Sequence, residues 1–233
     1  MDNTVSEGTN ESADQSTAPP QVPARRRIVL VHGATSGPWV FDGWAALWPH
    51  DDVRIPDLHE GLDVAHATMS DYADKVLAEE GQQRVTHQPV ILCGWSMGGL
   101  VAMMAALRCK PAALVVIEPS APSQIGGGDP YWPLEPGLYD AEFTYGPSVP
   151  GMLHRPESLY ARSERKRGIS VPVVPCPMLV VAGHEYVDTR GRPVADHYGA
   201  ELMEFPTLSH FQLVVEPRVR EAVAEWVDST TGA

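Results

Sequence analysis

The chain contains 233 residues, of which 43% are hydrophobic, and this is enough apolar material for a single domain with one core. Its net charge of −13 argues against nucleic acids and anionic membrane surfaces as partners, because both repel an acidic protein. A small molecule is therefore the expected partner, whereas nothing in the sequence indicates the oligomeric state.

The first 24 residues are rich in Ser, Thr, Asn, Asp, Glu and Pro and contain almost no apolar side chains. Such a segment cannot offset the entropy lost on ordering, so we expect a disordered tail over residues 1–24 and a folded domain over 25–233. Three consecutive arginines, Arg25, Arg26 and Arg27, open the domain. At the entrance of a strand they are expected to form a solvated edge.

The first predicted strand covers residues 28–31 and is followed by His32-Gly33. Ligands of open parallel sheets bind at the carboxyl ends of the strands, which is where this pair stands. Residues 38–48 predict the first helix, with aromatic side chains on its buried side and Trp39 or Phe41 at the mouth of a pocket. A strand over 53–57 and a helix over 69–80 come next, and the helix has apolar residues at helical spacing along one side.

The most informative stretch covers residues 89–106, where an apolar strand, Gly94-Trp95-Ser96-Met97-Gly98 and a run of good helix formers follow one another. A Gly-x-Ser-x-Gly turn between a buried strand and a helix forces the serine into strained backbone angles, and its glycines avoid collisions with neighbouring elements. Ser96 would then stand clear of the sheet as a nucleophile. The N–H of Met97 and the start of the helix would face the negative charge that develops beside it.

This segment resembles the nucleophile elbow of the α/β-hydrolase superfamily, and Leu30-Val31-His32-Gly33-Ala34 resembles its oxyanion loop. The resemblance extends over about residues 28–226. It implies an α/β fold with a reduced, mostly parallel sheet of about six strands flanked by helices, since the antiparallel strands that commonly precede the His-Gly strand have no room here. It also implies an oxyanion hole made by the N–H groups of Ala34 and Met97, whereas His32 is expected to be a structural hydrogen-bonding residue.

After the elbow helix, residues 113–117 predict a strand that is buried on both faces and is followed by Glu118. From about 121 to 174 the pattern dissolves into Gly, Pro, aromatic residues and short apolar pieces. In this superfamily an insertion at that place forms a small cap over the active site. Tyr131 and Trp132 are candidates for an apolar ceiling over the substrate, and a charged helix over 158–167 is expected to return the chain to the core.

A strand and turn over 177–183, a helix starting at 193, a strand over 201–205 and an amphipathic helix over 217–226 complete the alternation of strands and helices. A serine nucleophile needs a base within hydrogen-bond reach and a third group that holds this base. Of the nine histidines, only His210 follows the last predicted strand, which is where the hydrolase order places the base.

The third member of the triad is harder to assign. Members of the superfamily usually carry an aspartate three residues after a glycine such as Gly183, but this chain has Tyr186 there. Glu185 and Asp188 lie on either side of that position, and Glu118 ends a strand at a site that some α/β-hydrolases use for their acid. We prefer Glu118 narrowly over Asp188 and place Glu185 third.

Together these residues predict a serine hydrolase that cleaves an ester, thioester or lactone bond of a mostly apolar small molecule through an acyl-enzyme. Trp95 beside the serine and Phe211 beside the histidine favour an apolar acyl group. Two alternatives stay open: a lyase, acyltransferase or cyclase on the same scaffold, and a binding protein without turnover. No cofactor or metal is expected, because no cluster of His, Cys and Asp has ligand spacing.

The three cysteines show no paired spacing, and the N-terminus lacks the pattern of a signal peptide. No apolar run approaches the roughly 18 residues that a membrane helix needs. These features favour a cytoplasmic protein with free thiols.

Overall fold

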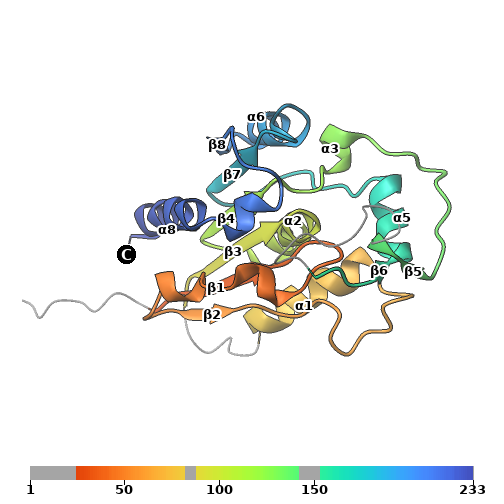
Figure 1. The fold of residues 1–233 in the computed structure, drawn as a ribbon, viewed down its shortest axis with the longest axis horizontal. Coiled ribbons are helices and arrows are strands. Elements are labelled where there is room, and N and C mark those ends of the chain that lie inside the picture. Colours follow the sequence, from red (N-terminus) through yellow and green to blue (C-terminus); the bar gives the residue numbers. More distant parts are fainter. Residues whose placement is uncertain (1–24, 82–87, 142–152, 233) are drawn as a thin grey trace, which may run out of the picture.

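The computed structural model describes residues 25–81, 88–141 and 153–232, which are built around a six-stranded sheet (Figure 1). The strands follow the order β2-β1-β3-β4-β7-β8, and each neighbouring pair is parallel. They are β1 (Arg27–Val31), β2 (Asp52–Arg54), β3 (Val90–Trp95), β4 (Ala113–Ile117), β7 (Met178–Gly183) and β8 (Glu201–Phe205). The predicted reduced parallel sheet of about six strands is confirmed.

Helices pack on both faces of this sheet (Figure 1). They are α1 (Met69–Gly81), α2 (Met97–Cys109), α3 (Ser123–Gly126), α5 (Leu159–Arg167), α6 (Arg192–Tyr198), α7 (Gln212–Val215) and α8 (Pro217–Thr231). Side chains alternate between the two faces along each strand. In β1, Val29 and Val31 therefore join one buried cluster with α1 and α2, whereas Ile28 and Leu30 join a second cluster with α7 and α8.

The predicted helix over residues 38–48 is wrong in its type. Two short 3₁₀ turns take its place, η1 (Pro38–Phe41) and η2 (Ala45–Leu47). Gly43 between them has a φ of +82°, which a right-handed helix cannot contain. The aromatic side chains nevertheless face the core as expected, because Phe41 and Trp44 are buried and Trp39 is half-buried.

The segment between β4 and β7 contains α3, a small antiparallel pair and α5. The pair consists of β5 (Leu138–Tyr139) and β6 (Glu157–Ser158). α5 confirms the predicted charged helix, and Ser158 caps it by accepting the N–H of Ala161 at 3.0 Å. Residues 142–152 of the predicted cap and the predicted tail over 1–24 lie outside the described residues. A π-helical turn, η3 (Val187–Gly191), links β7 to α6.

None of the described helices combines the length and the apolar character that crossing a membrane requires.

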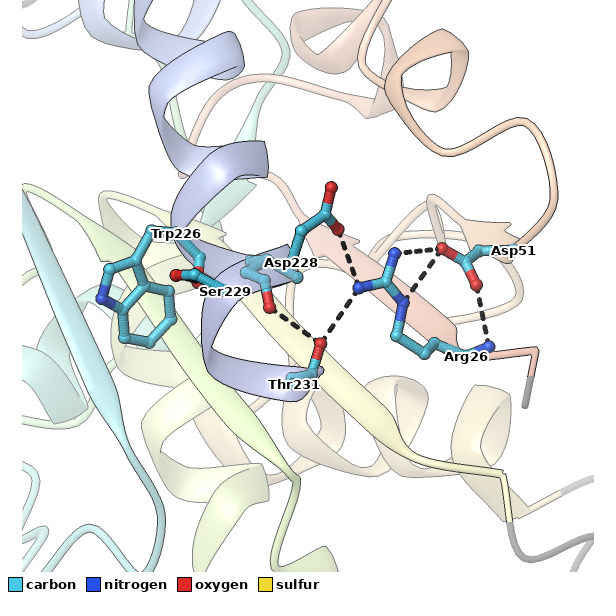
Figure 2. Close-up of polar contacts among 7 residues, drawn as sticks. Arg26, Asp51, Trp226, Asp228, Ser229 and Thr231 are labelled. Atoms are coloured by element: carbon cyan, nitrogen blue, oxygen red, sulfur yellow. Dashed lines mark hydrogen bonds and ion pairs between the residues drawn. The ribbon is translucent and has the colours of Figure 1, made fainter. Parts of the chain in front are cut away.

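The entrance of β1 is not the solvated edge that we expected, because Arg26 and Arg27 are buried. Figure 2 shows the guanidinium of Arg26 between Asp51 and the last turns of α8. It lies 2.6 Å from Asp51 Oδ2 and 2.8 Å from Asp228 Oδ1, and it donates a hydrogen bond to Thr231 at 3.0 Å. The expectation failed because these acceptors come from distant parts of the chain. Arg26 thus ties the first strand to the last helix.

Replacing Arg26 with Ala is expected to lower the free energy of unfolding by about 3 kcal/mol, because the nearly buried carboxylate of Asp51 then loses its counter-charge. Urea unfolding followed by circular dichroism measures this change. Arg25→Ala is the matched control, because Arg25 is exposed and its loss should change the free energy little. Equal effects of the two substitutions would contradict the role of Arg26.

Candidate active site

Ser96 follows β3 directly and has φ +56° and ψ −121°, a strained conformation for a residue with a side chain. The turn is possible because glycines stand two positions before and two positions after Ser96. A Cβ on Gly94 would lie 2.2 Å from the carbonyl oxygen of Gly98, and one on Gly98 would lie 2.1 Å from that of Val31. The N–H of Ser96 donates to the carbonyl of Ile117 in the neighbouring strand at 2.9 Å. The strained turn is therefore packed tightly against the ends of β1 and β4.

Glu118 and His210 form a hydrogen-bonded pair at the same edge of the sheet. Nδ1 of His210 lies 2.6 Å from Oε2 of Glu118, which is fully buried at the end of β4. The other carboxylate oxygen accepts the N–H of Gly183 at 2.6 Å. Both oxygens thus have a donor, as a buried carboxylate requires. Because an ionised carboxylate can only accept hydrogen bonds, the histidine carries a proton on Nδ1, and neutral imidazole then keeps a lone pair on Nε2.

The backbone of His210 is held as firmly as its ring. Its N–H donates to Oε2 of Glu185 at 2.9 Å, and its carbonyl accepts the indole N–H of Trp95 at 3.0 Å. The imidazole packs on Trp95 with ring centroids 5.0 Å apart and meets Tyr186 edge-on at 5.2 Å. His210 is therefore oriented beside the residue that precedes Ser96.

The other two candidate acids lie elsewhere. The side chain of Asp188 is 77% exposed and forms an ion pair with Arg192 one turn further along. Glu185 contacts the backbone of His210 rather than its ring. Of the three carboxylates considered, only Glu118 makes a described contact with the imidazole.

The predicted oxyanion loop lies against the serine turn. A Cβ on Gly33 would lie 3.1 Å from the Cβ of Ser96 and 2.8 Å from the ring of Trp95, so a larger residue would not fit. The N–H groups of Ala34 and Met97 have no hydrogen-bond acceptor among the residues that the structure describes. Two unused backbone donors thus lie next to the serine.

His32 makes hydrogen bonds inside this loop and is fully buried. The backbone N–H of Leu58 donates to Nε2 of His32 at 3.1 Å, so the proton of the neutral ring is on Nδ1. Nδ1 lies 2.9 Å from the carbonyl oxygen of Gly33. Both ring nitrogens therefore have structural partners, in agreement with the expected role of His32.

Three of the proposed substrate-binding residues lie together. The ring centroid of Phe211 is 6.2 Å from that of Trp39 and 6.2 Å from that of Trp95. Trp95 is buried beneath His210, whereas Trp39 and Phe211 are half-buried. Trp39 and Phe211 are thus the better placed of the three to meet a ligand.

Tyr131 and Trp132, the candidates for an apolar ceiling, lie at the surface. The two residues are 89% and 42% exposed. Their backbone N–H groups bond to Asp129, which holds both residues in a turn at the surface. Within the described part of the chain, no three His, Cys, Asp or Glu side chains are grouped so as to hold a metal ion.

Several contacts within the site have no local signal in the sequence. Gly183 lies 65 positions after Glu118, and His210 lies 115 positions after Trp95. Only the parallel order of the strands brings these residues together. Gly183 closes an apolar run, and this pattern indicates a turn rather than a hydrogen bond to Glu118.

The structure has the architecture of the α/β-hydrolases. It combines a parallel sheet with a strained serine turn. At the same edge lie a Glu-His pair and two backbone N–H groups that have no acceptor among the described residues. The profile described as "Alpha/beta hydrolase family" matches residues 28–226. The chain belongs to this family.

A protein named pimeloyl-[acyl-carrier protein] methyl ester esterase, from Aromatoleum aromaticum, is 38% identical over 104 residues. This match covers 41% of the present chain and 38% of that protein, which is well under two thirds of its length. Among solved structures, a lipase-esterase related protein from Clostridium acetobutylicum has a TM-score of 0.64 at 19% identity over 89% of this chain and 95% of that one. The RedJ thioesterase from the prodiginine pathway of Streptomyces coelicolor has a TM-score of 0.62 at 20% identity, over 93% and 97%. At these identities the two structures are similar in fold.

His59 is buried next to His32 of the predicted oxyanion loop. Its backbone N–H donates to Asp57 at 3.0 Å, and its ring lies 6.0 Å from that of His32 and 5.8 Å from that of Tyr72. Nε2 of His59 has no hydrogen-bond partner among the described residues. Burial lowers the pKa of His59 from 6.5 to about 4, and the charge of Arg155 acts in the same direction.

The lowered pKa of His59 predicts a loss of stability in acid. Below pH 6.5 the unfolded chain binds a proton at this position, whereas the folded chain does so only near pH 4. The contribution of His59 is thus complete above pH 6.5 and decreases by roughly 2 to 3 kcal/mol as the pH falls to about 4. Urea unfolding at pH 7.0 and 4.5 should show a smaller pH difference for His59→Gln than for the wild type. Equal pH differences would contradict the prediction.

Proposed function

We propose that this chain is a serine hydrolase in which Ser96, His210 and Glu118 form a catalytic triad. The observation that carries the proposal is the 2.6 Å contact between Nδ1 of His210 and the buried carboxylate of Glu118. A serine needs such an oriented base to attack a carbonyl group at neutral pH. The strained turn at Ser96 and the membership of the α/β-hydrolase family support the assignment.

In the proposed reaction, Oγ of Ser96 attacks the carbonyl carbon of the substrate while Nε2 of His210 takes the hydroxyl proton. The N–H groups of Ala34 and Met97 donate to the oxyanion that forms. Glu118 stabilises the imidazolium through Nδ1. His210 then gives its proton to the leaving alcohol or thiol, and an acyl-enzyme remains.

The second half of the reaction uses the same groups. His210 removes a proton from water, and the resulting hydroxide attacks the acyl carbonyl within the same oxyanion hole. Collapse of this intermediate releases the carboxylic acid and returns the proton to Oγ of Ser96. No step needs a cofactor.

The substrate is proposed to be an ester, thioester or lactone of a mostly apolar small molecule. The half-buried rings of Trp39 and Phe211 beside the Glu-His pair support an apolar acyl group. The name of the Aromatoleum aromaticum relative specifies a pimeloyl-[acyl-carrier protein] methyl ester, which supports ester chemistry for the shared segment.

Labelling with a fluorophosphonate tests whether Ser96 is an activated nucleophile. The intact protein should take up one label at Ser96, and Ser96→Ala should take up none. No labelling of the wild type would contradict the proposal and favour a binding protein. Labelling without hydrolysis of p-nitrophenyl esters or acyl thioesters would favour a lyase, acyltransferase or cyclase.

Two conservative amide substitutions test the assignment of the acid. In Glu118→Gln the amide would donate to the ring and impose the wrong tautomer, so kcat should fall on the order of a thousandfold or more. Asp188→Asn is the matched control and should change kcat less than about twofold, because Asp188 is exposed and paired with Arg192. A large loss in Asp188→Asn alone would show that the acid is assigned wrongly.

A further inference from the structure

The peptide group between Gly33 and Ala34 carries the proposed oxyanion donor on one side and a carbonyl on the other. This peptide is trans, so its C=O and N–H bonds point in opposite directions. Any group that holds the Gly33 carbonyl therefore also sets the direction of the Ala34 N–H.

Two buried side chains hold this carbonyl. The hydroxyl of Ser36 donates to the oxygen of Gly33 at 2.9 Å, and Nδ1 of His32 lies 2.9 Å from the same oxygen. The N–H of Leu58 occupies Nε2 of His32, which leaves Nδ1 as the donor. Ser36 and His32 are both fully buried, so water does not compete for these hydrogen bonds.

The peptide on the other side of Ala34 is held by Arg155, which lies just before β6. The backbone N–H of Arg155 donates to the carbonyl of Thr35 at 2.8 Å, and its guanidinium binds Asp57 at 3.0 and 3.1 Å. Thr35 has a φ of +58°, which is costly for a β-branched residue and persists only where the surroundings impose it. Ala34 thus lies between two anchored carbonyl groups.

We propose that Ser36 and His32 are positioning residues that lock the Gly33–Ala34 peptide and thereby point the Ala34 N–H at the substrate oxyanion. This inference rests on the proposed hydrolase function. The lock acts before any substrate binds, so the donor needs no reorganisation when negative charge develops. Its loss should therefore affect the transition state more than the bound ground state.

The test compares Ser36→Ala with Ser163→Ala, a control that removes another buried serine hydroxyl from α5. In Ser36→Ala the carbonyl ¹³C resonance of Gly33 should move upfield, because one of its hydrogen bonds is lost. With a p-nitrophenyl ester, kcat should fall about tenfold with KM changed less than about twofold, a fraction of the loss on deleting an oxyanion donor. The Ki of a trifluoromethyl ketone, which forms an oxyanion at the serine, should rise by the same factor as kcat/KM falls. Ser163→Ala should show none of these changes.

Each outcome separates the inference from the proposed function. An unchanged Gly33 resonance in Ser36→Ala would overturn the lock, whether or not the protein is an esterase. A shifted resonance with unchanged kcat and Ki would overturn the positioning role and leave the hydrolase function standing. If the wild type is neither labelled nor active, the proposed function fails, and the Gly33 resonance then decides alone whether the peptide is locked. A thermal melt of both variants separates a general loss of stability from the local effect.

Discussion

A buried carboxylate is stable only when hydrogen-bond donors compensate its charge, and the rest of the site depends on how this requirement is met at Glu118. One oxygen takes the N–H of Gly183 at the end of β7, and the other takes Nδ1 of His210 in the loop after β8. The adjacent order β4-β7-β8 places both donors within reach of the same side chain. The proposed base is thereby held in one tautomer and one orientation.

Close backbone packing is the second constraint on this edge of the sheet. The serine turn fits between the ends of β1 and β4 because Gly94 and Gly98 leave no Cβ in the way. The same closeness places Gly33 against Ser96, which brings the backbone donors of Ala34 and Met97 beside the serine. The proposed oxyanion hole is thus a consequence of packing, with the buried side chains behind the loop setting its direction.

A glutamate at the end of β4 changes the task of the loop after β7. That loop no longer has to supply a carboxylate to the ring of His210, and Tyr186 stands at the position where the superfamily usually has its aspartate. Its ring meets the imidazole edge-on, while Glu185 holds the backbone N–H of His210. The loop therefore still fixes His210. It does so through the ring of Tyr186 and a hydrogen bond to the main chain, and not through a carboxylate that contacts the imidazole.

The sequence by itself determined the alternation of strands and helices and the serine turn, because hydrophobic periodicity and turn chemistry act over a few neighbouring residues. The resemblance to the α/β-hydrolases then indicated His210 as the candidate base. It left three carboxylates open as partners of His210 and misjudged the arginines at the entrance of β1. Only the tertiary structure showed which carboxylate contacts the imidazole of His210 and which acceptors surround Arg26. The partners of a buried charge are set by strand order and register, and here they lie 65 and 92 positions away from Glu118, where no local pattern can indicate them.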